Sequence, residues 1–244
     1  MSDSLGALAN MEYPGRFIIL GYDPSGEQMV AVYGITGRSP SSRARKLEFE
    51  GNAIWTKPID EETLKKGNPE LLIYPALIFT AGIAVSNGRQ TADVKKHMEG
   101  AKKPALVLNR AMSKWDYEPD APIFTPRISG CVLPDLRAAL GIIIRINDGS
   151  SKKNVYEVPP SAGRGKLIAT YNGENMDPVP SFRNEPLDLE IAEKTPQDMA
   201  EAIFAALEPQ RGRLDFRVAV ACVYSPDFKK DAPRFFILNR SERS

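Results

Sequence analysis

A proline-rich loop between Asp116 and Ser129 carries the residue types that acid–base chemistry uses. Its sequence, Asp-Tyr-Glu-Pro-Asp-Ala-Pro-Ile-Phe-Thr-Pro-Arg-Ile-Ser, places three carboxylates, a phenol, two aliphatic hydroxyls and an arginine among three prolines. Each proline holds its own φ near about −65° and restricts the residue before it. The polar groups of this loop are therefore held still, as a site that recognises a polar ligand requires.

Two carboxylates of this loop, Glu118 and Asp120, lie two residues apart. A positioned carboxylate can take a proton from a reacting group and return it to a leaving group, and Glu118 is the preferred residue for that task. Tyr117 or Tyr74 can donate a hydrogen bond to a reacting oxygen. We expect Arg127 to pair with Glu118 or Asp120 and to keep that carboxylate ionised. For Asp120 and Arg127 the alternative is an ion pair that only braces the loop.

A second stretch, Gly37-Arg38-Ser39-Pro40-Ser41-Ser42-Arg43, is rich in hydrogen-bond donors. Arg38 and Arg43 lie five residues apart, and a guanidinium group matches a phosphate or a carbonyl oxygen with two N–H groups. Serine hydroxyls, including that of Ser39, add donors of the kind used for phosphate. This stretch is either a ligand-binding loop or a solvated, flexible surface loop.

The third stretch, Val85-Ser86-Asn87-Gly88-Arg89-Gln90-Thr91, combines a turn dipeptide with the start of a predicted helix. Backbone N–H groups at a helix start favour anions and carbonyl oxygens. The side chains of Asn87 and Gln90 each donate and accept, which suits the edge of a base or a carboxamide. The alternative is an ordinary turn followed by a helix N-cap.

Composition narrows the classes of function. The 244 residues are 42% apolar, enough for a sizeable core, and indicate a single domain over 1–244. The net charge of +1 argues against nucleic acid or an anionic membrane as the main partner, because both usually demand a basic excess. No apolar run approaches the roughly 20 residues that span a bilayer, and residues 1–10 lack the features of a signal peptide. We expect a cytoplasmic protein whose two cysteines, Cys131 and Cys222, are buried reduced thiols.

Several catalytic arrangements are missing from the sequence. His97 is the only histidine and stands beside two lysines, so neither a serine–histidine triad nor a histidine-based metal site is predicted. The sequence contains no Cys-x-x-Cys motif, no Gly-x-Gly-x-x-Gly motif and no Walker loop. We therefore expect chemistry without a metal or a cofactor.

The elements that must position these residues are mostly strands. Strands are predicted over 16–22, 28–36, 44–50, 53–57, 71–80, 83–86, 123–133, 140–147, 154–158, 166–171, 216–224 and 234–238. Helices are predicted over 90–98 and 196–207, with Thr195 as the N-cap of the second, and a helical turn is predicted over 61–66. The stretch 105–112 fits a helix or a strand, and a helix is preferred. The proline-rich stretch 178–188 reads as a loop. Because helices do not alternate regularly with strands, the pattern favours an α+β fold with antiparallel sheets.

Taken together, the three polar stretches resemble the signatures of the archaeal-type inosine monophosphate (IMP) cyclohydrolase family and its bacterial relatives. The resemblance begins at Tyr13-Pro14-Gly15-Arg16 and continues in the same order to Phe182. It implies a four-layer αββα sandwich like that of the N-terminal nucleophile hydrolases, used without self-processing. It also implies the last step of purine biosynthesis, the closure of 5-formamidoimidazole-4-carboxamide ribonucleotide to IMP with loss of water. A purine nucleotide is then the partner, without a cofactor, and the sequence is compatible with a homo-oligomer.

The resemblance also implies roles for individual residues. It implies that Arg38, Tyr74 and Glu118 are catalytic. It implies that the substrate is bound by Arg16, Ser39, Arg43, Asn87, Gln90, Thr91, Tyr117, Asp120, Thr125 and Arg127. In the family signature the residue before Thr-Pro-Arg is commonly asparagine, and here it is Phe124. If that asparagine contacts the ligand, this chain has lost a polar contact there. A different substrate is then an alternative.

The same residues are compatible with two other functions. Another amidohydrolase of this scaffold would need cleavage to expose an N-terminal nucleophile, and the Gly130–Cys131 bond is the best candidate. A non-catalytic purine nucleotide-binding protein would keep the pocket without turnover. The presence of Glu118 and Tyr74 favours catalysis, because binding alone would tolerate their loss.

Overall fold

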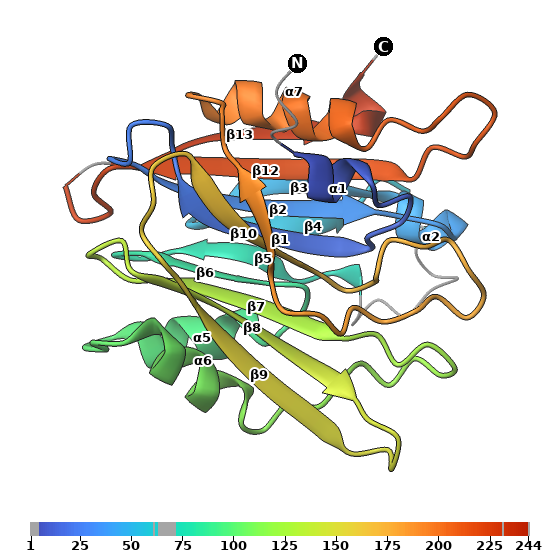
Figure 1. Cartoon of the computed structure of the whole chain (residues 1–244), viewed down its shortest axis with the longest axis horizontal. Helices are drawn as coiled ribbons and strands as arrows, with labels where there is room; N and C mark the ends of the chain where they lie inside the picture. Colours follow the sequence, from blue (N-terminus) through green and yellow to red (C-terminus); the bar gives the residue numbers. More distant parts are fainter. Residues whose placement is uncertain (1–4, 61, 63–71, 231, 244) are drawn as a thin grey trace.

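Two antiparallel β-sheets lie face to face in the computed structural model, which describes residues 5–60, 62, 72–230 and 232–243 (Figure 1). The six-stranded sheet has the order β11-β10-β1-β2-β12-β13, and the seven-stranded sheet runs from β3 to β9 in sequence order. Every neighbouring pair is antiparallel. The predicted α+β class with antiparallel sheets is confirmed.

The six-stranded sheet joins the first and last parts of the chain. Its strands are β1 (Arg16–Tyr22), β2 (Met29–Thr36), β10 (Arg164–Ala169), β11 (Leu187–Glu190), β12 (Arg217–Ser225) and β13 (Arg234–Asn239). The hairpin predicted for the first two strands is confirmed. Strand β11 overlaps the stretch 178–188, so the loop prediction was wrong at its end. The residue types of β11 do not predict a strand, and β11 forms because its backbone pairs with that of β10.

The seven-stranded sheet is a meander in which each strand pairs with the next. Its strands are β3 (Arg45–Glu50), β4 (Ala53–Pro58), β5 (Pro75–Phe79), β6 (Ile83–Ser86), β7 (Arg127–Val132), β8 (Ala138–Arg145) and β9 (Ser151–Val158). The prediction that a strand starts at 123 was wrong, because prolines on both sides of that segment withhold backbone N–H donors and β7 begins only at Arg127. The helical turn predicted over 61–66 lies outside the described residues, apart from Glu62.

Helices cover the outer faces of the two sheets. They are α1 (Gly6–Ala9), α2 (Pro40–Arg43), α5 (Thr91–Met98), α6 (Pro104–Met112), α7 (Pro196–Ala206) and the 3₁₀ turn η1 (Arg240–Glu242). Helices α5 and α6 pack on the seven-stranded sheet, and α7 packs on the six-stranded sheet (Figure 1). Thr195 caps α7 as predicted by accepting a hydrogen bond from the backbone N–H of Asp198. Within the described ranges, no helix has the length and apolar character needed to cross a membrane.

The space between the sheets is apolar along most of its length and polar at one end. Ile18, Val32, Leu77 and Leu140 are among the buried residues of the main core. At the polar end, where α2 lies on the right of Figure 1, β1, β3, β5 and β7 begin and β2, β6 and β10 end. The stretches 38–43, 87–91 and 116–126 connect strands at this end. Antiparallel pairing therefore brings segments that are distant in sequence to one edge of the sandwich.

Candidate active site

A buried carboxylate, that of Glu118, lies at the point where the two sheets meet. Glu118 is 2% exposed and accepts hydrogen bonds from Nη2 of Arg16 at 2.7 and 2.9 Å. Nδ2 of Asn87 donates a third hydrogen bond at 3.0 Å. Arg16 begins β1 in one sheet, whereas Asn87 follows β6 in the other. The carboxylate thus has fixed donors from both sheets.

The surroundings of Glu118 change its acidity. Burial raises the pKa of Glu118 above its ordinary value, although the charges of Arg16 and Arg127 act in the opposite direction. Burial is the largest single influence on the pKa of Arg16 and acts to lower it, but the Glu118 carboxylate and the neighbouring tyrosines Tyr74, Tyr171 and Tyr33 together outweigh burial, and the pKa of Arg16 is raised. Arg16 therefore stays cationic. Glu118 accepts a proton more readily than an exposed glutamate, which is a property of a general base.

A chain of amides and one guanidinium group holds Asn87 in place. Oδ1 of Asn87 accepts hydrogen bonds from the backbone N–H of Ile128 at 2.8 Å and from Nε2 of Gln90 at 3.0 Å. Nη1 of Arg127 in turn donates to Oε1 of Gln90 at 3.2 Å. Because Oδ1 of Asn87 is occupied, its Nδ2 must face Glu118 and the carbonyl of Pro126. Asn87 and Gln90 thus fix the orientation of the carboxylate.

The expectation that Arg127 pairs directly with Glu118 or Asp120 was wrong. Its Nε donates to the backbone carbonyl of Asp116 at 2.8 Å, and its guanidinium group lies 4.9 Å from the ring centre of Trp115. Arg16, from the opposite sheet, makes the ion pair with Glu118 instead. The sequence separation of 102 residues between Arg16 and Glu118 explains why local reasoning missed this pair.

Tyrosine hydroxyls border the ion pair. The hydroxyl oxygens of Tyr33 and Tyr74 lie 2.7 Å apart, and both side chains are buried. The Tyr171 hydroxyl lies 2.9 Å from Oγ1 of Thr125. Burial raises the pKa of Tyr33, and it raises that of Tyr171 to about 12, so these two phenols stay protonated at neutral pH. Sequence reasoning identified Tyr74 but missed Tyr33, because a tyrosine inside the apolar run of β2 looks like an ordinary core residue.

Asp120 braces its own loop. Oδ1 of Asp120 accepts a hydrogen bond from the backbone N–H of Thr125 at 2.7 Å, and Oδ2 accepts one from the Thr125 hydroxyl. The backbone N–H of Glu118 donates to the carbonyl of Thr125 at 2.8 Å. Together with the prolines, these bonds hold the segment that carries Glu118. Asp120 therefore braces the loop, but through hydrogen bonds to Thr125 and not through the ion pair that was the predicted alternative.

The remaining predicted residues lie at the same end of the sandwich without joining the cluster. Tyr117 donates to the carbonyl of Gly149 at 2.8 Å, and Thr91 donates to the carbonyl of Gly88 at 2.8 Å. The stretch before β3 satisfies much of its own hydrogen-bonding capacity: Ser39 caps α2, Arg43 donates to the carbonyl of Arg38, and Arg38 donates to the carbonyl of Met176. Ser39 and Arg43 are exposed and Arg38 is half-buried, so all three residues reach the surface at this end.

Phe124 adopts a backbone conformation that suits the asparagine of the family signature better than it suits phenylalanine. Its φ is 51°, in the left-handed region that asparagine tolerates far better than phenylalanine. Its ring makes an edge contact with Tyr117 at 5.5 Å and lies 4.2 Å from the guanidinium group of Arg145. An asparagine in the family therefore fits the backbone here, whatever it contacts.

We expect Phe124→Asn to be more stable than Phe124→Ala by roughly 0.5–1 kcal/mol. Both variants lose the ring contacts with Tyr117 and Arg145, but only asparagine suits a φ of 51°. Urea-induced unfolding of the two variants measures the difference. Equal stabilities would show that the backbone conformation at this position is not a source of strain.

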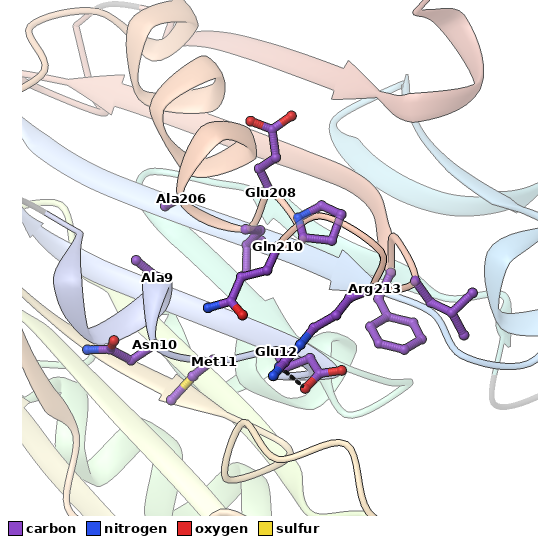
Figure 2. Close-up of a pocket in the computed structure, with 12 residues that line it drawn as sticks. Ala9, Asn10, Met11, Glu12, Ala206, Glu208, Gln210 and Arg213 are labelled. Atoms are coloured by element: carbon purple, nitrogen blue, oxygen red, sulfur yellow. Dashed lines mark hydrogen bonds and ion pairs between the residues drawn. The ribbon is translucent and has the colours of Figure 1, made fainter.

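A surface cavity of about 160 Å³ lies between the end of α1 and the end of α7 (Figure 2). Two of its charged side chains pair with each other, since Arg213 donates to Glu12 at 2.7 Å. Phe216 lines the cavity and contacts Tyr13, with ring centres 5.2 Å apart. Tyr13 contacts Tyr171 on its other side, at 5.3 Å. These aromatic rings stand between the cavity and the Glu118 cluster, and we assign the chemistry to the cluster.

The proposed cleavage point at Gly130–Cys131 lies inside β7. Cys131 pairs with Ala84 of β6 and Ala139 of β8, so cleavage there would disrupt a central strand. Burial raises the pKa of the Cys131 thiol to about 12, which leaves it without the thiolate character of a nucleophile. The structure therefore gives no support to Cys131 as an N-terminal nucleophile.

Comparison with known proteins identifies similar chains. Residues 13–227 match the family model described as IMP cyclohydrolase-like protein. The IMP cyclohydrolase of Methanopyrus kandleri is 31% identical over 179 residues, which cover 73% of this chain and 83% of that protein. The IMP cyclohydrolase of Methanocaldococcus jannaschii is 27% identical over 192 residues, covering 78% and 85%. A solved structure of an Anbu mutant from Hyphomicrobium aligns with 93% of this chain and 89% of its own at 10% identity, and its TM-score of 0.34 supports no conclusion about the fold.

Proposed function

The chain belongs to the IMP cyclohydrolase-like family, and from that membership we propose that it closes 5-formamidoimidazole-4-carboxamide ribonucleotide to IMP. The observation that supports this reaction best is the buried Glu118 carboxylate, which Arg16 and Asn87 hold between the sheets. The enzyme class is a hydrolase that acts on a cyclic amidine. A purine nucleotide is the substrate.

The reaction makes definite demands on a protein. The carboxamide nitrogen, a poor nucleophile, attacks the formyl carbon of the same molecule and loses a proton. The tetrahedral carbinolamine that results then loses its hydroxyl group as water. A protein can hold the two groups facing each other, stabilise charge on the formyl oxygen, and move the protons.

We assign the proton transfers to Glu118. In the first step its carboxylate takes a proton from the carboxamide nitrogen and gives it to the formyl oxygen, which becomes the hydroxyl group of the carbinolamine. In the second step it takes the proton of the formamido nitrogen and gives it to the hydroxyl group, which leaves as water while the new carbon–nitrogen double bond forms. Because burial raises the pKa of Glu118, both its protonated and its ionised forms are accessible nearer to neutral pH than for an exposed glutamate. Asn87 keeps the carboxylate aimed through the hydrogen bond at 3.0 Å.

Charge on the formyl oxygen needs a donor, and Arg16 offers one. Its Nε is buried and has no hydrogen-bond partner among the described residues. A cationic N–H group in a site shielded from water stabilises developing negative charge strongly. The Tyr74 hydroxyl, bonded to that of Tyr33, is a second donor. Arg38, Ser39 and Arg43 are proposed to contact the nucleotide at the exposed rim of the same end, and Thr91, Tyr117, Asp120, Thr125 and Arg127 to shape the site.

The finer fold and the location of the protein belong to the same proposal. Helices on the outer faces of two stacked antiparallel sheets support a four-layer αββα sandwich of the N-terminal nucleophile hydrolase type. In such a fold Glu118 would take over the proton transfers without a freed N-terminus. A purine biosynthetic enzyme works where nucleotides are made, so we propose a cytoplasmic location.

Incubation of the purified protein with the formylated ribonucleotide, followed by absorbance and chromatographic detection of IMP, tests the function. Formation of IMP at a rate proportional to enzyme concentration is expected. Saturable binding of IMP without turnover would instead identify a non-catalytic nucleotide-binding protein. Absence of both turnover and binding would refute the proposal.

Gly88 is packed so closely that a single added methyl group should disturb the site. A Cβ at Gly88 would lie 2.6 Å from Oε1 of Gln90 and 2.8 Å from Nη1 of Arg127. We expect Gly88→Ala to lower kcat/KM by about tenfold to a hundredfold, because small misplacements of positioning groups have effects of this size. Steady-state kinetics measure the loss, and thermal unfolding shows whether the fold is retained. Unchanged kinetics would remove Gln90 and Arg127 from the proposed positioning role.

A further inference from the structure

A second buried guanidinium group, that of Arg45, lies at the polar end and has no role in the reaction above. Arg45 begins β3, is 1% exposed, and has the same strand parity as the buried Leu47, so it faces the space between the sheets. Its Nε donates to the carbonyl of Ser42 at 3.0 Å. Its Nη1 is buried and has no hydrogen-bond partner in the described part of the chain.

Buried positive charge exceeds buried negative charge in this region. Arg16 pairs with Glu118, whereas Arg127 and Arg45 bond only to neutral acceptors among the described residues. Counting the half-buried Asp120 still leaves more cations than carboxylates. Burying an unpaired charge is costly unless a counter-charge or hydrogen bonds compensate for it. The region is therefore suited to an anion.

The charges around the tyrosine pair show how the cations are arranged. Burial raises the pKa of Tyr33, while the charges of Arg16 and Arg45 both act to lower it. The strongest charge effects on Glu118 come from Arg16, Arg127 and Asp120. Tyr33, whose hydroxyl oxygen lies 2.7 Å from that of Tyr74, is therefore close enough to both Arg16 and Arg45 for their charges to act on it. A nucleotide whose base reacts at Glu118 would extend past the two phenols toward Arg45.

We propose that Arg45 binds the phosphate group of the nucleotide. A guanidinium group suits a phosphate because its N–H groups match two phosphate oxygens, and the phosphate charge would compensate the excess of buried cations. Arg45 donates to the segment that carries α2, a helix that contains no buried residue. Access of the phosphate therefore requires this segment to move aside. This inference names the substrate contact within the proposed function, but the contact would serve any phosphate monoester.

Calorimetric titration with IMP and with inosine, which lacks the phosphate, tests the assignment. We expect Arg45→Met to weaken IMP binding by about thirtyfold, the size of a lost charge-assisted hydrogen bond to a phosphate, and to leave inosine binding within about twofold. Arg45→Lys keeps the charge but loses the fork, so an intermediate loss is expected. A loss below about threefold for IMP, or an equal loss for inosine, would overturn the proposal.

Thermal unfolding provides a second test in case an Arg45 variant folds too poorly for calorimetric titration. Inorganic phosphate should raise the Tm of the wild-type protein and raise that of Arg45→Met much less, because a ligand stabilises only the state that binds it. Arg137→Met is the matched control: Arg137 is an exposed arginine bonded to Asp135 beyond the end of β7, and its loss should leave the phosphate effect intact. If Arg45→Met does not fold, the effect of phosphate on the Tm of Arg45→Lys is compared with its effect on the wild-type protein instead. An undiminished phosphate effect in the Arg45 variant would refute the site.

The two proposals fail in different ways. IMP formation with an Arg45 variant that binds IMP normally would refute the phosphate site and leave the function standing. Arg45-dependent binding of IMP over inosine without any ring closure would support the site and refute the function. Competition of inorganic phosphate with IMP distinguishes a nucleotide phosphate from a separate site for free phosphate, which would bind both ligands together.

Discussion

Glu118→Gln should lower turnover by about a thousandfold while nucleotide binding is retained. Glutamine keeps the size of the side chain and an oxygen that can accept from Arg16 or Asn87, but it cannot take up a proton. The hydrogen bonds at 2.7, 2.9 and 3.0 Å to the wild-type carboxylate make the position well enough defined for a single-atom change to be informative. Turnover comes from single-turnover kinetics and binding from titration with IMP.

The pH profile gives a second readout of the same residue. A general base must be ionised, so kcat/KM should fall as the pH drops through the pKa of Glu118. Because burial raises that pKa, the acid limb should lie at higher pH than for an exposed glutamate. The acid limb should disappear from the residual activity of Glu118→Gln.

Asp120→Asn is a suitable control, since Asp120 lies in the same loop but bonds to Thr125. We expect this variant to lose less than about tenfold in turnover and to keep the acid limb, because it loses only a bracing interaction. Equal losses for the two variants, or an unchanged acid limb in Glu118→Gln, would assign the proton transfers to another group.

Arg16→Met should destabilise the folded protein by about 3–5 kcal/mol. Removing the guanidinium group leaves the Glu118 carboxylate buried at 2% exposure with Asn87 as its remaining side-chain donor among the described residues. A buried charge without its partner costs far more than the pair contributes. Guanidinium-induced unfolding at pH 7 measures the effect.

Neutralising Glu118 should rescue this variant. We expect Arg16→Met combined with Glu118→Gln to recover about 2 kcal/mol or more relative to Arg16→Met, since the unpaired charge is then gone. Arg213→Met provides the control: Arg213 pairs with Glu12 at a similar distance of 2.7 Å but is 52% exposed, so a cost of about 0.2–1 kcal/mol is expected. If Arg16→Met and Arg213→Met lower the free energy of unfolding by similar amounts, or if Glu118→Gln does not restore stability, then burial does not make the Arg16–Glu118 pair more important to stability than an exposed pair.

The parts of the fold that follow from local pattern were predicted well. The hairpin of β1 and β2, the helix that Thr195 caps, and the strands around Gly51 follow from turn residues, capping residues and apolar periodicity. Strand β11 and the start of β7 were not predicted correctly, because pairing with a distant strand and withheld proline donors decide them.

The candidate site divides in the same way. Glu118, Asn87 and Gln90 were identified because their residue types and their rigid or turn-forming neighbours indicate a polar site. The contacts among these residues were not predicted. Arg127 was expected to pair with Glu118 or Asp120, whereas the ion-pair partner of Glu118 is Arg16. One feature of the sequence could have identified Arg45. In the predicted strand the alternation of side chains places it on the inward-facing side, where an arginine is unusual.

By itself, the sequence determined the chemical content of this protein: which carboxylate, amides, phenols and arginines are present, on which rigid loops, and in which class of fold. Only the tertiary structure decided which of them meet. Arg16 reaches Glu118 and Tyr33 reaches Tyr74 because two antiparallel sheets stack and bring strand ends from distant parts of the chain to one edge. Burial at that edge then raises the pKa of Glu118 and leaves Nη1 of Arg45 without a hydrogen-bond partner in the part of the chain that the structure describes. Both effects depend on the exclusion of water by residues far away in sequence, which no local pattern records.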